Sequence, residues 1–136
     1  MKQVLATIVG LIAASATVFI VEKIGHTIFP MPDFIDSSNM ESIKSNIESI
    51  PKGNMVFVAI AHGLGILVGM FVAGIIAKTS MIPSYIVGGL MVIISIAYYF
   101  LIPSPTWFVV VDLASIITGF IVGKKLALGK TKLTKH

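Results

Sequence analysis

The feature that most constrains this chain is a series of four long apolar runs that carry very few charges. They extend over residues 4–28, 55–77, 82–102 and 106–123. As helices, runs of this length can cross the roughly 30 Å hydrocarbon core of a bilayer, whereas the strands of a membrane barrel would alternate polar and apolar residues. Because the second, third and fourth runs are joined by short connections, neighbouring helices must be antiparallel. We predict an all-α membrane protein, a four-transmembrane-helix antiparallel bundle that forms a single domain over residues 1–136.

The composition agrees with a membrane class and excludes several others. Apolar residues make up 56% of the chain and charged residues 12%, and the mean hydropathy is +0.99, well outside the range of soluble domains. All ten basic residues are Lys, and none forms a stripe with aromatics, so nucleic acid is not an expected partner. The absence of Cys excludes disulfides, thiol nucleophiles and thiolate metal sites.

The N-terminal run resembles a signal peptide, because Lys2 precedes apolar residues and an Ala14-Ser15-Ala16 cleavage pattern. However, the apolar run continues past that pattern to Val21. We therefore expect this segment to be a membrane span that is not cleaved.

The first connection, residues 29–54, is polar and acidic, and we predict a short amphipathic helix within it. Ser38 and Glu41 have the spacing of a capping box, and Pro51 ends the segment. Apolar residues then recur every three or four positions along one helical face: Met40, Ile43, Ile47 and Ile50.

The distribution of Lys predicts the orientation. Most Lys residues fall on the side of the two termini: Lys2, Lys78, Lys124, Lys125, Lys130, Lys132 and Lys135. The positive-inside rule then places both termini in the cytoplasm and the acidic loop outside. We expect a Lys-rich tail over residues 124–136, either close to anionic lipid headgroups or simply solvated.

Small residues form a predicted helix-packing seam along the second span. They occupy every fourth position: Ala61, Gly65, Gly69, Ala73 and Ala77. Small side chains allow two helix backbones to approach closely in a membrane. Shorter series occur in the first span (Ala6, Gly10, Ala14) and the fourth (Ser115, Gly119, Gly123). The seams could meet within the chain, which we favour, or could meet a partner.

Ionisable residues inside the spans are the best functional signal, because an unpaired charge in a bilayer is costly. With a rise of about 1.5 Å per residue, Glu22, His62 and Asp112 lie about 9–12 Å below the outer helix ends, at one common depth. His26, Tyr98 and Tyr99 lie slightly closer to the same surface. The pattern predicts a polar intramembrane cluster in the outer leaflet.

Such a cluster could relay protons, bind a cation or hold the polar head of a ligand. Its spacing lacks a dense metal-binding motif, and no arrangement for nucleophilic catalysis is present, so we expect no metal, no cofactor and no enzymatic activity. The alternative is structural: Glu22 could mark the end of a short span, His62 could bond one carbonyl, and the tyrosines could belong to an interfacial belt.

Several motifs together resemble a group of small, uncharacterised bacterial four-span inner-membrane proteins. The resemblance covers nearly the full length through Glu22–His26, Pro30-Met31-Pro32, Ile50–Gly53, Ala61–Gly65 with Gly69, and Ile102–Phe108. It implies a four-helix fold in a bacterial inner membrane, and it brings no activity with it. Members of that group often carry an aromatic residue at the position of His62, which implies that a histidine there is not indispensable.

Two functions follow from these observations. The first is an accessory or scaffold subunit that packs against other membrane proteins, suggested by the small size and the seams. The second is an oligomeric transporter or channel-like module that uses the polar Glu/His/Asp site. The lipid bilayer, and either a membrane-protein partner or further copies of the chain, are the expected partners.

Overall fold

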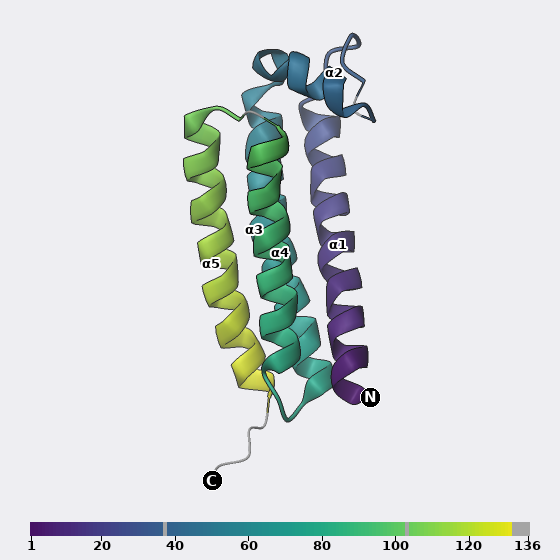
Figure 1. The fold of residues 1–136 in the computed structure, drawn as a ribbon, viewed down its shortest axis with the longest axis vertical. Helices are drawn as coiled ribbons and strands as arrows, with labels where there is room; N and C mark the ends of the chain where they lie inside the picture. Colours follow the sequence, from purple (N-terminus) through teal and green to yellow (C-terminus); the bar gives the residue numbers. More distant parts are fainter. Residues whose placement is uncertain (37, 103, 132–136) are drawn as a thin grey trace.

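The computed structural model describes residues 1–36, 38–102 and 104–131, and it is a bundle of four long helices. The long helices are α1 (Lys2–Ile28), α3 (Lys52–Ala77), α4 (Ile82–Leu101) and α5 (Thr106–Lys130). A short helix α2 (Met40–Ser45) and a 3-10 turn η1 (Ile47–Ser49) lie across one end of the bundle (Figure 1). All four long helices are long and apolar enough to cross a membrane. The predicted four-helix membrane fold is therefore confirmed.

Helix α3 is the centre of the bundle. Half of its apolar membrane-spanning stretch is buried within the bundle, compared with 17% of the stretch in α1 and 28% of the stretches in α4 and α5. The core around it contains Ile66 and Met70 of α3, which pack with Val87 and Met91 of α4 and Ile116 of α5. The outward faces of α1, α4 and α5 remain apolar and exposed, as a lipid-facing surface requires.

The predicted seam on α3 lies against α1. A Cβ atom added at Gly69 would stand 2.8 Å from Ala14 Cβ, and one added at Gly10 would stand 2.9 Å from the carbonyl oxygen of Gly69. All five seam residues are buried: Ala61, Gly65, Gly69, Ala73 and Ala77. The seams therefore meet within the chain.

A second small-residue face of α3 packs on α5. A Cβ atom at Gly119 would overlap the backbone of Gly63, and one at Gly74 would stand 2.8 Å from Ala127 Cβ. Ser115 Oγ also donates a hydrogen bond of 2.7 Å to the carbonyl of Ala59. Helix α3 thus packs closely against α1 on one face and against α5 on another.

Two local predictions require correction. The N-cap of α2 is Asn39, whose side chain accepts hydrogen bonds from the N–H groups of Glu41 and Ser42, so the Ser38–Glu41 capping box is wrong. Ser38 instead donates its N–H and its hydroxyl to Asp36. These two bonds lower the pKa of Asp36 because they stabilise its carboxylate form.

The Lys-rich segment after Gly123 is not simply a tail. Helix α5 continues through Lys130, so Lys124 and Lys125 lie on its last turns. The Nζ atom of Lys124 lies 6.0 Å from the ring centre of Tyr85. Residues 132–136 of the predicted tail lie outside the described residues.

Candidate functional site: a polar-lined cavity at one end of the bundle

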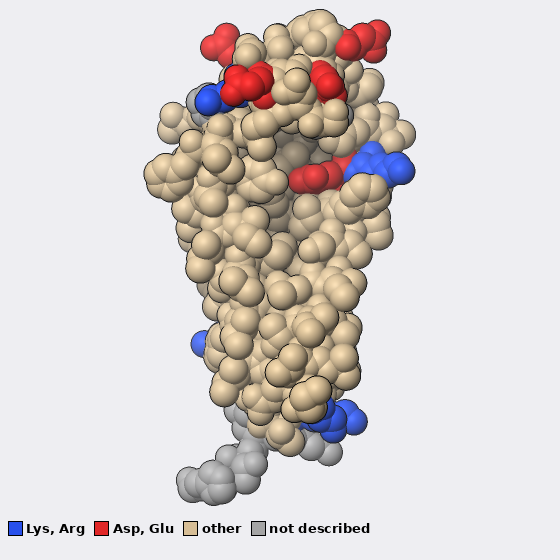
Figure 2. Space-filling view, turned by 45° about the vertical axis from the view of Figure 1, so that its right-hand side comes forward, with Lys and Arg blue, Asp and Glu red and all other residues tan. Residues whose placement is uncertain are grey.

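A cavity of about 590 Å³ lies between the long helices at the end that carries α2. Figure 2 shows the corresponding hollow in the surface, just below the acidic end of the molecule, with an acidic side chain at its edge. The four residues predicted to form one amphipathic face all line the cavity: Met40, Ile43, Ile47 and Ile50. The first connection therefore covers the cavity with its apolar side.

Asp112 of α5 is fully buried next to the cavity and organises a small network. Its Oδ1 atom lies 2.7 Å from Nδ1 of His62 on α3, and its Oδ2 atom accepts a hydrogen bond from the hydroxyl of Tyr99 on α4. Three helices are thus joined through one carboxylate. Two donors satisfy a group whose burial in an apolar bundle would otherwise be costly.

This network determines which atom His62 presents to the cavity. Because a carboxylate only accepts hydrogen bonds, Nδ1 of His62 must carry the proton that faces Asp112. The other ring nitrogen, Nε2, has no hydrogen-bond partner among the described residues. Every buried side-chain nitrogen or oxygen of the described residues has a hydrogen-bond partner. Because Nε2 has none, this atom must be accessible, and His62 lines the cavity. In the neutral ring Nε2 is an acceptor.

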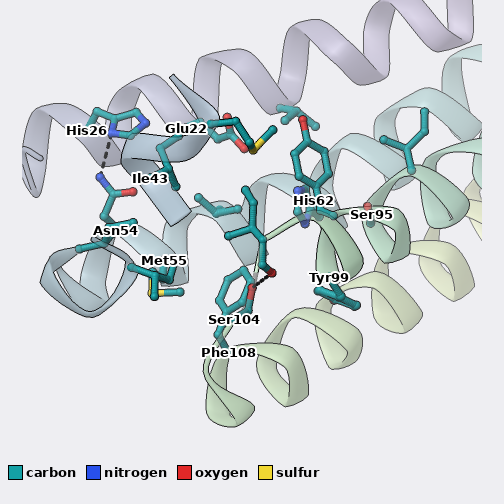
Figure 3. A pocket seen from close by; sticks show the side chains of 18 of the residues that line it. Glu22, His26, Ile43, Asn54, Met55, His62, Ser95, Tyr99, Ser104 and Phe108 are labelled. Carbon is teal, nitrogen blue, oxygen red and sulfur yellow. Dashed lines mark hydrogen bonds between the residues drawn. The ribbon is translucent and has the colours of Figure 1, made fainter. Parts of the chain in front are cut away.

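Glu22 of α1 adds a second acceptor to the cavity wall. Figure 3 shows Glu22 and His62 on different helices around the same space. Within the described part of the chain, His62 and Asp112 are the sole basic and acidic side chains that lie within ion-pair distance of each other, so no basic side chain lies that close to the Glu22 carboxyl group. The adjacent Lys23 is exposed, with its Nζ atom 5.6 Å from the ring centre of Phe19.

His26 is occupied by a contact that the sequence did not reveal. Asn54 Nδ2 lies 2.9 Å from His26 Nδ1 (Figure 3). It also donates a hydrogen bond of 2.9 Å to the carbonyl of Phe29. The Phe29 carbonyl fixes the amide orientation, so Asn54 Nδ2 is the donor in both contacts and Nδ1 of His26 accepts. Asn54 joins the start of α3 to the end of α1 beside the cavity.

The structure therefore divides the six predicted residues into two groups. His62, Asp112 and Tyr99 are in direct contact, whereas Glu22, His26 and Tyr98 line the cavity without joining that network. Tyr98 is 45% exposed. Asn54 and Ser95 also line the cavity and were not predicted. Asn54 lies within the first turn of α3, where polar residues are common.

The arrangement suits reversible binding better than metal chemistry. No three His, Asp or Glu side chains among residues 1–36, 38–102 and 104–131 are placed to hold a metal ion. The cavity wall is mostly apolar, with a few convergent polar atoms, which is the usual character of a small-molecule site. Its ionisable groups are Glu22, His26, His62 and the two tyrosines, with no Lys among its described residues.

Comparison of the chain with protein-family models, with curated proteins and with solved structures found no match. The geometry of the cavity is therefore the basis for assigning a function.

Proposed function

We propose that this chain is a membrane-embedded binding module of a transporter-like kind, which holds a small amphiphilic molecule in the cavity beneath α2. One observation carries the proposal: a cavity of about 590 Å³ with an apolar wall contains the Glu22 carboxylate and the accessible Nε2 of His62. An apolar body could pack on the Met and Ile side chains while a polar head reaches these two groups. The volume falls within the usual range for small-molecule sites.

A transporter-like module is favoured over an accessory or scaffold subunit because the packing motifs are already used inside the chain. Gly65 and Gly69 lie against α1, and Gly119 lies against Gly63. The small-residue seams are therefore not available to a foreign helix. A subunit role stays a prediction, and a partner that remains bound at fixed stoichiometry after gentle extraction would support it.

The proposed location is a bacterial inner membrane, with the start of α1 and the end of α5 on the cytoplasmic side. Support comes from charge: in Figure 2 the acidic side chains lie at the α2 end or just below it, and the opposite end shows only basic ones. Under the positive-inside rule the cavity would then open near the outer surface. The chain could act there as an oligomer, since four helices enclose little volume.

Native mass spectrometry of the protein released from a gentle detergent tests the binding function. We expect the wild type to retain a small-molecule adduct, and Val58→Trp to lose it, because Val58 lines the cavity and Trp would fill it. The matched control is Val56→Trp on the same helix, since Val56 is 37% exposed and does not line the cavity.

The comparison of these two variants decides the outcome. Loss of the adduct in Val58→Trp alone supports the proposal. An adduct that survives in both variants, or that is absent from the wild type, contradicts a ligand site in this cavity.

A further inference from the structure

We infer that the cavity selects an amphiphile whose head group is a protonated amine. The inference rests on the proposed binding function and names the class of ligand. It comes from the hydrogen-bonding character of two groups in the cavity wall, the Glu22 carboxyl group and the Nε2 atom of His62, which have no hydrogen-bond partner among the described residues.

The Glu22 carboxylate is an acceptor, as is Nε2 of His62 in the neutral ring, whereas an ammonium group is a pure donor. The Glu22 carboxylate can only accept hydrogen bonds. Nδ1 of His62 donates to Asp112 at 2.7 Å, so in the neutral ring the lone pair lies on Nε2. An ammonium group offers three N–H donors to such acceptors, whereas a deprotonated carboxylate head offers none.

The charge around the cavity also favours a cationic head group. The Glu22 carboxyl group has no basic side chain within ion-pair distance among the described residues. Asp112 lies just behind His62 and is fully buried, so its field is little screened. The described lining contains no Lys, and the exposed Lys23 lies over the ring of Phe19. A cationic head group would compensate the charge of these carboxylates.

The remaining lining suits a hydrocarbon body. On α3 and α4 it consists largely of Met55, Val58, Met91 and Ile94, and the first connection adds its four apolar side chains. Methionine adapts its shape readily to apolar ligands. Two other polar side chains of the lining already have hydrogen-bond partners within the chain. Ser95 donates to the carbonyl of Met91, and Asn54 bonds His26 and Phe29.

The test measures binding of four amphiphiles of equal chain length to the full chain in phosphatidylcholine nanodiscs, with empty nanodiscs subtracted. The probes are nonylammonium, nonyltrimethylammonium, nonan-1-ol and nonanoate. We expect saturable binding of nonylammonium at least about tenfold tighter than that of nonanol or nonanoate. The affinity of nonyltrimethylammonium should lie between that of nonylammonium and those of nonanol and nonanoate, because it has the positive charge but lacks N–H donors.

A variant pair tests the role of Glu22 itself. Glu22→Gln keeps the side-chain shape and removes the charge, so we expect nonylammonium affinity to fall at least about tenfold. Glu48→Gln is the control, because Glu48 lies in η1 and does not line the cavity. Thermal unfolding of both variants checks that they fold. The selectivity of the wild type among the probes needs no variant at all.

The outcomes separate this inference from the binding function. If nonanol or nonanoate binds as tightly as nonylammonium, or if Glu22→Gln binds nonylammonium unchanged, the head-group inference is overturned. The binding function survives that result if Val58→Trp still abolishes binding of the preferred probe. If no probe binds saturably and native mass spectrometry finds no adduct, both proposals fail.

Discussion

At the scale of single residues, the two adjacent tyrosines of α4 show how sharply position determines role. Tyr99 donates a hydrogen bond to the buried Asp112, whereas Tyr98 is 45% exposed and its hydroxyl forms no hydrogen bond within the described part of the chain. Successive residues of a helix point about 100° apart, so only one of the two can face α5. A matched pair of substitutions can therefore distinguish the stability that the Tyr99 hydroxyl contributes through Asp112 from the contribution of an aromatic ring alone.

We expect Tyr99→Phe to lower the free energy of unfolding by about 1–2 kcal/mol, because it removes a donor from a buried carboxylate. Tyr98→Phe should change it by less than about 0.5 kcal/mol. Unfolding in mixed detergent micelles, followed by circular dichroism, measures both. Equal effects of the two substitutions would show that the Tyr99–Asp112 bond contributes no specific stability.

Sequence reasoning found part of this network for a physical reason. The cost of charge in a bilayer singles out Glu22, His62 and Asp112, and the helical rise gives each residue a depth. Depth alone could not choose Tyr99 over Tyr98, because the rotation of α4 about its axis depends on how it packs. It also could not show that His62 contacts Asp112 directly.

At the scale of helices, α3 determines the arrangement by presenting small residues to two neighbours. The four-residue spacing of Gly65 and Gly69 predicted a seam, and the structure shows α1 lying against it. The contact between Gly63 and Gly119 was harder to foresee, since it lies on another face of α3. Likewise Ser38 and Asn39 are both good N-cap residues, and composition could not decide which one begins α2.

Two glycines of α5 provide a test of the close contact with α3. Gly119→Ala should destabilise the protein by about 1–3 kcal/mol, because the added Cβ would overlap the backbone of Gly63. Gly129→Ala should be neutral or stabilising by up to about 1 kcal/mol, since nothing lies within 4 Å of a Cβ there and Ala favours helix. Unfolding midpoints of both variants give the comparison. A Gly119→Ala variant as stable as Gly129→Ala would contradict the close approach of α3 and α5.

At the scale of the whole molecule, the bundle is tightly packed where the small residues meet and hollow at the end beneath α2. Figure 2 shows a molecule that is broader at that end. The four apolar runs predicted the fold class. They could not predict the cavity, because its walls come from every long helix and from the first connection. An amphipathic segment in a loop gives no sign of what its apolar face covers.

The central claim is that water and a cationic ligand can reach this cavity inside the bundle. Because the chain contains no Cys, single cysteines can be labelled without background in nanodiscs, using the water-soluble cation aminoethyl methanethiosulfonate. We predict that Val58→Cys, in the cavity wall, reacts at least about tenfold faster than Val56→Cys, which faces outward on the same helix. Nonylammonium should slow the reaction at Val58→Cys alone. Equal labelling rates at the two positions, unaffected by nonylammonium, would contradict the account.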